Sequence, residues 1–118
     1  MRTDFDGDGR PDLIAAANNG PLRALRRGDA PGGRWLAVRL PQERAAGAEI
    51  TFRRDGQPDQ LAVLAAGGGY WSQDDSVAWF GLGTSGPAAG SLTVRWPDGT
   101  STARDWDGKA STLIILPK

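Results

Sequence analysis

Leu92-Thr93-Val94-Arg95-Trp96-Pro97-Asp98-Gly99 is the segment from which the fold can first be inferred. Its apolar side chains alternate with Thr93 and Arg95, which is the period-two pattern of a half-buried strand. Proline suits the second position of a tight turn and glycine suits its exit, so the end of the segment indicates a turn. Because another strand-like run follows at residues 101–106, the segment predicts a β-hairpin.

Short strand-like runs recur along the rest of the chain, and no stretch keeps a helical apolar period for three turns. Seventeen glycines and eight prolines separate these runs. Further strands are predicted at residues 13–17, 22–25, 35–40, 50–53, 60–65 and 112–116. The sequence therefore predicts an all-β fold, a small antiparallel sandwich or barrel of about seven to eight strands that follows an N-terminal strand pair.

An acidic loop precedes that strand pair, with the sequence Asp-Phe-Asp-Gly-Asp-Gly-Arg-Pro-Asp at residues 4–12. Calcium takes six to eight hard oxygen ligands, and calcium loops supply them from alternate positions around a glycine turn. The matching ligands here are the carboxylates of Asp4, Asp6, Asp8 and Asp12 and the carbonyl group of Arg10. The loop thus predicts a calcium site, although Ala15 stands where an EF-hand has a bidentate glutamate. The alternative is a solvated acidic turn, since turns also favour Asp and Gly.

The composition excludes several classes of function. The chain has 118 residues, no cysteine, no histidine and a formal net charge of zero. Disulfides, thiolate metal sites and most hydrolytic triads are therefore excluded. Balanced charge gives no electrostatic reason to expect nucleic acid as a partner, and no apolar run is long enough to predict insertion into a membrane.

A second candidate site lies at residues 67–75, where three glycines precede Tyr70 and Trp71. Aromatic faces beside amide and carboxylate groups suit a sugar, so we consider a carbohydrate site formed by Tyr70, Trp71, Gln73 and Asp74. The structural alternative is that the aromatic rings plug the end of the sandwich while the glycines form a bulge.

Two other motifs favour structural roles. Phe80-Gly81-Leu82-Gly83 is most simply a strand end that turns a tight corner. Hydrolysis by paired carboxylates would have to use Asp74 with Asp75, or Asp105 with Asp107. Without histidine, cysteine or a pocket signal, a hydrolase is the weakest of the three functional readings, and we predict that the chain is not an enzyme.

The motifs together resemble an FG-GAP type calcium-loop repeat followed by an ASPIC/UnbV domain, as in the cartilage acidic protein-like family. The N-terminal part of this resemblance is carried by residues 4–13 and 18–20. The C-terminal part is carried by residues 35–40, 47–50, 67–73, 80–83 and 94–99. The chain departs from the family at residues 42–44, where an Asn-Arg pair is frequent, and in having one repeat rather than several.

The glycine-rich, polar stretch 26–33 predicts a boundary between residues 1–30, the calcium-loop repeat fragment, and residues 34–118, the ASPIC/UnbV-like domain. The resemblance implies calcium at the loop and an extracellular or cell-surface parent protein. No signal peptide is recognisable, and we expect the chain to be a piece of a longer protein.

We therefore expect a non-enzymatic module for adhesion, assembly or protein interaction, in which calcium is structural. The alternative is a carbohydrate-binding module that uses residues 67–75. The partner is expected to be a protein or a glycan, and exposed strand edges predict pairing with another copy of the chain.

Overall fold

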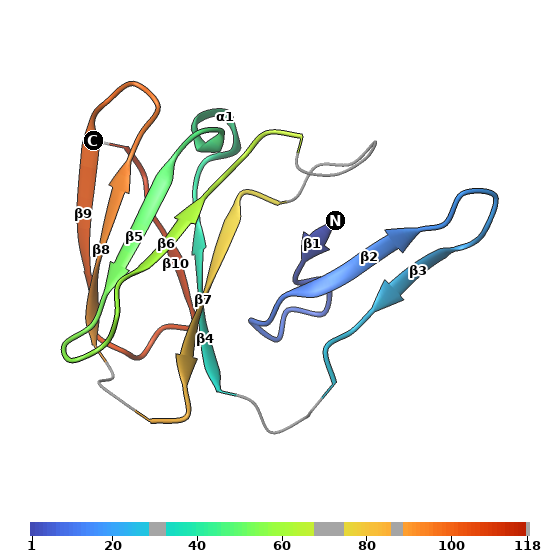
Figure 1. The fold of residues 1–118 in the computed structure, drawn as a ribbon, viewed down its shortest axis with the longest axis horizontal. Helices are drawn as coiled ribbons and strands as arrows, with labels where there is room; N and C mark the ends of the chain where they lie inside the picture. Colours follow the sequence, from blue (N-terminus) through green and yellow to red (C-terminus); the bar gives the residue numbers. More distant parts are fainter. Residues whose placement is uncertain (29–32, 68–74, 86–88, 118) are drawn as a thin grey trace.

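The structure is a computed structural model that describes residues 1–28, 33–67, 75–85 and 89–117. Two sheets, with strand orders β10-β4-β7 and β6-β5-β8-β9, lie face to face, and a third sheet, β1-β2-β3, lies beside them (Figure 1). The strands are β1 Arg2–Thr3, β2 Asp12–Ala16, β3 Leu22–Leu25, β4 Arg34–Arg39, β5 Glu49–Arg53, β6 Gln60–Val63, β7 Val77–Gly83, β8 Gly90–Arg95, β9 Ser101–Trp106 and β10 Thr112–Ile114. The all-β prediction is confirmed, and the seven strands β4–β10 form a sandwich rather than a closed barrel.

The strand pairing follows the predicted hairpins with one exception. Strands β8 and β9 pair antiparallel from Gly90↔Trp106 to Arg95↔Ser101, as the turn at residues 97–99 predicts. Strand β10, however, runs parallel to β4, so the predicted antiparallel sandwich contains one parallel pair, at this edge. Because β7 already pairs with one side of β4, the last apolar run adds to the other side in the direction in which the chain arrives from β9.

The hydrophobic core lies between the two sheets of the sandwich. It joins alternate residues of β4 and β7 to alternate residues of β5 and β8, together with Trp96 and Trp106. The Phe52 ring packs 5.4 Å from Phe80 and 5.7 Å from Trp106, measured between ring centroids. The Trp96 indole N–H donates to the hydroxyl oxygen of buried Thr102 at 2.9 Å, which satisfies the polar atom that its burial would otherwise leave unpaired.

Two elements extend what the sequence predicts. A single helical turn, α1 Gln42–Ala45, follows β4, where four residues are too few to produce a helical period. Strand β1 adds a third strand to the predicted N-terminal pair, since Arg2 pairs with Leu13. No helix in the described part of the chain has the length and apolar character required to cross a bilayer.

The glycines at the end of β7 lie where the backbone turns or packs closely against β4. Strand β7 ends at Gly83 with a φ of 71°, in agreement with the predicted tight corner. A Cβ atom at Gly81 would lie 3.9 Å from the Trp35 ring. A Cβ atom at Gly33 would lie 2.6 Å from the backbone of Gly83, so the two chain segments approach too closely for a side chain there. The glycines thus allow close packing at the start of β4.

The N-terminal sheet lies against the β4–β7 side of the sandwich (Figure 1). The Arg27 guanidinium stacks over the Trp35 ring, with 5.0 Å between the guanidinium carbon and the ring centroid. The acidic loop approaches the β9–β10 connection, because a Cβ atom on Gly9 would lie 3.7 Å from the side chain of Ser111. These contacts hold the acidic loop close to the sandwich.

Candidate functional site

The acidic loop brings three of its predicted ligands together. One carboxylate oxygen from each of Asp4, Asp6 and Asp8 lies within 4.8 Å of the others. The glycines between and after them, Gly7 and Gly9, have φ angles of 77° and 79°, which glycine adopts without the strain that a side chain would bring. The alternation of aspartate and glycine therefore folds the loop so that its carboxylates converge.

Backbone N–H groups order these carboxylates. Asp4 accepts hydrogen bonds from the backbone N–H groups of Gly7 at 2.8 Å, Asp8 at 3.0 Å and Gly9 at 2.9 Å. Asp8 accepts from the N–H of Arg10 at 2.8 Å. Since an ionised carboxylate has about four lone-pair sites, these bonds fix the side chains while leaving acceptor capacity for a cation.

The predicted fourth carboxylate, Asp12, lies apart from this group. Its side chain is 1% exposed and accepts hydrogen bonds from the backbone N–H groups of Phe5 at 3.3 Å and Arg27 at 2.8 Å. Asp12 therefore ties the beginning of β2 to the loop and to the segment after β3. The sequence pattern does not reveal this role, because Arg27 is fifteen residues away.

One arginine already offsets part of the charge of the loop. The Arg26 Nε atom lies 3.3 Å from a carboxylate oxygen of Asp6. Both side chains are partly exposed, so solvent screens the attraction.

The donor set fits calcium. Three carboxylates on one compact loop supply hard oxygen ligands, and calcium tolerates the irregular geometry that short loops impose. The residues that would hold the ion are Asp4, Asp6 and Asp8, with the Arg10 carbonyl group as a further predicted ligand. Nearby negative charges favour a bound cation, since they repel one another without it.

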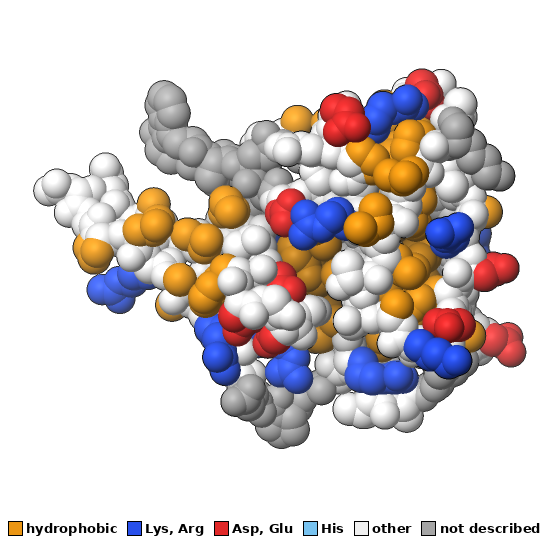
Figure 2. All heavy atoms as spheres, turned by 180° about the vertical axis from the view of Figure 1, so that it is seen from behind, with side chains coloured by type: hydrophobic (Ala, Val, Ile, Leu, Met, Phe, Trp, Pro, Cys, Tyr) orange, Lys and Arg blue, Asp and Glu red, His pale blue; other side chains and the backbone are white. Residues whose placement is uncertain are grey.

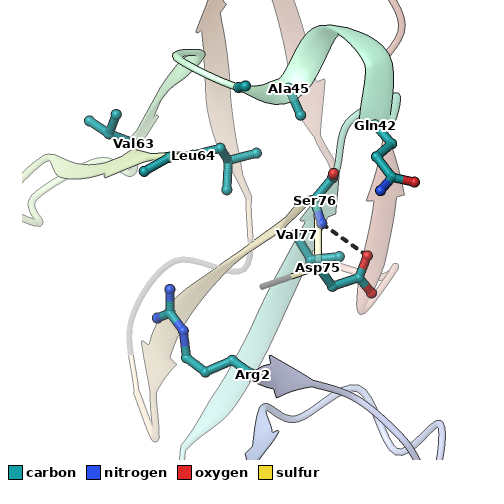
Figure 3. Close-up of a pocket in the computed structure, with 10 residues that line it drawn as sticks. Arg2, Gln42, Ala45, Val63, Leu64, Asp75, Ser76 and Val77 are labelled. Carbon is teal, nitrogen blue, oxygen red and sulfur yellow. Dashed lines mark hydrogen bonds between the residues drawn. The ribbon is translucent and has the colours of Figure 1, made fainter. Parts of the chain in front are cut away.

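The predicted sugar site falls largely outside the described residues, which exclude Tyr70, Trp71, Gln73 and Asp74. A cavity of about 190 Å³ is lined by Asp75 and Ser76, the first two described residues after this segment. Figure 3 shows its walls, with Arg2 entering from β1, Gln42 and Ala45 from α1, and Leu64 from the segment after β6. Asp75 accepts hydrogen bonds from the N–H of Ser76 at 2.9 Å and from Arg39 at 3.0 Å.

The remaining candidate carboxylates have structural partners or lie in solvent. Asp107 accepts the backbone N–H of Lys109 at 3.0 Å, which closes a small turn after β9. Asp105 is exposed on β9. Of the two pairs considered for hydrolysis, Asp105 and Asp107 thus lie on an exposed strand position and turn, and Asp74 of the other pair lies outside the described residues.

A second cavity, of about 200 Å³, lies between residues of the acidic loop and residues of the sandwich. Asp8 and Arg10 line it on the loop side, and Arg34, Trp35 and Lys109 line it on the sandwich side. Sequence reasoning missed this group because the residues are distant along the chain and none belongs to a recognisable cationic motif.

Comparison with known proteins identifies the sandwich. Residues 40–114 match the family described as ASPIC and UnbV. This chain is a member of the ASPIC and UnbV family. The matched residues run from the end of β4 to β10, so the family assignment rests on the sandwich and not on the acidic loop.

Three relatives extend the similarity of this ASPIC and UnbV chain towards its N-terminus. It is 36% identical over 110 residues to cartilage acidic protein 1 of Homo sapiens, which covers 87% of this chain and 16% of the human protein. The Mus musculus protein is 36% identical over 109 residues, covering 86% and 16% respectively. The Xenopus tropicalis protein is 36% identical over 122 residues, covering 97% and 18%. The chain spans roughly a sixth of the length of these curated relatives.

Proposed function

We propose that this chain is a non-enzymatic β module for protein interaction or assembly, and that a structural calcium ion orders its N-terminal loop. The observation that carries the proposal is the convergence of the Asp4, Asp6 and Asp8 carboxylates within 4.8 Å on a loop that lies against the sandwich. A bound cation would relieve the repulsion among these carboxylates. The ion would therefore stabilise both the loop and its position beside the sandwich.

Calcium in this role contributes to folding rather than to chemistry. An ion that binds the ordered loop but not the unfolded one transfers its binding free energy to the folded state. Three carboxylates without the bidentate glutamate of an EF-hand place the expected dissociation constant at roughly 10⁻⁴–10⁻³ M, the range of extracellular modules. Such an affinity suits a compartment with millimolar calcium.

The proposal includes the origin of the N-terminal part. We assign residues 1–30 to an FG-GAP type calcium-loop repeat and residues 34–118 to the ASPIC and UnbV domain. An extracellular or cell-surface location of the parent protein agrees with the weak calcium affinity that we expect. It also agrees with the relatives, which are named for cartilage.

The proposed interaction surface is the exposed N-terminal sheet. Strand β3 is exposed along its whole length, and its free edge carries unpaired backbone groups that can pair with another strand. Leu13, Leu22 and Leu25 are exposed on the same sheet, where they could pack against a protein partner. A second copy of the chain is the simplest such partner. Light scattering across a concentration series tests it, and a monomeric mass at every concentration would argue against pairing.

Carbohydrate binding by residues 67–75 is the alternative function. The cavity lined by Asp75 and Ser76 favours it, since Asp75 is part of the predicted segment and a concave site with a few polar groups suits a small ligand such as a sugar. Binding on a glycan array that is lost in Trp71→Ala would support this alternative, and the absence of any bound glycan would remove it.

Calcium calorimetry tests the main proposal directly. We expect saturable binding for the wild type and none for the double variant Asp6→Ala with Asp8→Ala. The matched control, Asp55→Ala with Asp105→Ala, removes the same charge at exposed positions outside the acidic loop and should bind like the wild type. Equal titrations of all three proteins would overturn the calcium assignment.

A further inference from the structure

The cavity between the acidic loop and the sandwich has a predominantly cationic wall. Arg10 reaches it from the loop, Arg34 from the start of β4 and Lys109 from the β9–β10 connection. Within the part of the chain that the structure describes, none of these three side chains has an ion pair. Three unpaired cations around one cavity repel one another, and an anion between them would remove that cost.

The wall is also ordered before any ligand arrives. The Trp106 indole N–H donates to the carbonyl oxygen of Ala110 at 2.8 Å, and Asp107 accepts the N–H of Lys109 at 3.0 Å. These bonds fix the connection that carries Lys109. A rigid site loses less entropy when it binds a ligand, so it can be selective at modest size.

A β-bulge lies in the sandwich wall of this cavity. Arg34 pairs with Gly83 and Trp35 pairs with Gly81, so Leu82 is the extra residue on β7. Bulges bend a strand and redirect nearby side chains, and they are frequent beside binding sites. Arg34 and Leu82 both line the cavity, and Leu82 also belongs to the hydrophobic core.

Figure 2 shows that Lys and Arg side chains occur along the lower margin of the molecule in that view. The cavity volume of about 200 Å³ is below the range typical of drug-sized ligands, which starts near 300 Å³. It therefore suits one small charged group rather than a large cofactor.

We propose that this cavity is a binding site for an oxyanion, the sulfate or carboxylate group of an acidic ligand, held by Arg10, Arg34 and Lys109. Guanidinium groups bind planar and tetrahedral oxyanions through paired N–H donors, and lysine adds a point charge. Asp8 is the one carboxylate in the described lining. One of its oxygens accepts the Arg10 backbone N–H, and among the described residues Asp8 forms no ion pair with Arg10, Arg34 or Lys109.

The site goes beyond the proposed calcium function but touches it through Asp8. A calcium ion on the loop would neutralise the carboxylate nearest to the cavity, and the anion should then bind more tightly. The anion titration is therefore run twice, once with EDTA and once with millimolar calcium. This design separates failure of the anion site from failure of the calcium site, which calorimetry tests without any anion.

The experiment is a titration of the ¹⁵N-labelled chain with sodium sulfate, followed by amide chemical shifts and compared with sodium chloride at equal ionic strength. We expect saturable shifts at Gly9, Lys109 and Ser111 in at least one of the two conditions. Arg34→Gln and Lys109→Gln should each weaken binding roughly tenfold, because each removes one charged contact. The control Arg23→Gln removes one exposed arginine of β3 outside the cavity and should bind like the wild type.

The same spectra show whether each variant is folded, so a lost site can be distinguished from a lost structure. Shifts that do not saturate in either condition would overturn the proposal. An equal loss of affinity in Arg23→Gln would also overturn it, because the effect would then reflect net charge rather than a site. Saturation in calcium alone would support the anion site and its coupling to the loop.

Discussion

The N-terminal sheet and the sandwich are built from similar strands but are stabilised differently. The sandwich encloses a continuous apolar core to which both of its sheets contribute. In the N-terminal sheet, every residue of β3 is exposed, and Asp12 is the only residue of the three strands that is buried. Small sheets without a covered face are marginal in water. Burial of apolar side chains therefore stabilises the sandwich, whereas the N-terminal sheet depends on polar contacts and on its docking against the sandwich.

Truncation of an aromatic side chain in the sandwich core should destabilise the protein most. Phe52→Ala removes a ring that is 1% exposed and packs against Phe80 and Trp106. We expect it to lower the free energy of unfolding by about 3–5 kcal/mol, the usual cost of emptying a core aromatic position. Chemical denaturation measures this loss.

The matched variant on the other side is Leu22→Ala, which truncates a side chain that is 70% exposed on β3. It should change global stability by less than about 0.5 kcal/mol, as exposed positions usually do. Comparable losses in Phe52→Ala and Leu22→Ala would show that a partner, such as a second copy, covers the N-terminal sheet in solution.

The next effect concerns the buried carboxylate of the N-terminal sheet. Asp12→Ala leaves the backbone N–H groups of Phe5 and Arg27 without their acceptor. We expect a cost of roughly 2–3 kcal/mol, confined to this sheet, because hydrogen bonds to charged groups are stronger than neutral ones. Hydrogen exchange should quicken at the amides of β2 and β3 while the core of the sandwich stays protected.

The exposed Asp55 provides the control for this variant, since Asp55→Ala removes the same charge from a turn. If Asp12→Ala accelerated exchange equally in β5 and β8, the N-terminal sheet and the sandwich would unfold as one unit, and the expected difference in their stabilisation would be wrong.

Calcium should have a somewhat smaller effect. With a dissociation constant of roughly 10⁻⁴–10⁻³ M, calcium at about 10 mM would stabilise the folded state by about 1.4–2.7 kcal/mol. The gain should appear as slower exchange in residues 1–28 and should vanish in Asp6→Ala with Asp8→Ala. Magnesium provides a matched ion, and an equal response to both ions would indicate charge screening rather than a calcium site.

The sequence predicted strands well wherever one face is buried and the other is wet. Alternation at residues 92–96 and the turn after it located β8, β9 and their hairpin correctly. The parallel pairing of β10 could not be predicted, because a short apolar run carries no signal for the direction in which it pairs. Helix α1 could not be predicted either, since a single helical turn is too short to show the apolar period of a helix.

The candidate site was predictable only in part, and for a similar reason. Asp4, Asp6 and Asp8 lie two positions apart along the chain, so their proximity in space could be predicted from the sequence alone. Asp12 also falls on an alternate position, yet its carboxylate accepts a hydrogen bond from the backbone N–H of Arg27, in the segment after β3. This long-range contact determines its role. The cationic cavity joins residues from three separate segments, and such long-range proximity leaves no trace in a local pattern.

A smaller effect is expected in the turn between β8 and β9, which contains Asp98 and lies outside the proposed calcium site. Hydrogen bonds from the Thr100 hydroxyl and backbone N–H lower the pKa of Asp98, and the charge of Arg44 acts in the same direction. A carboxylate whose pKa is lower in the folded state stabilises the protein above its unfolded pKa of about 3.8, and this contribution is lost as the pH falls through the folded value. We expect Asp98→Asn to melt slightly below the wild type at pH 7, and the two melting temperatures to converge in stronger acid. Asp105→Asn is the control on an exposed strand position, and a difference between Asp98→Asn and wild type that stays constant with pH would show that the carboxylate charge of Asp98 is not what holds this turn.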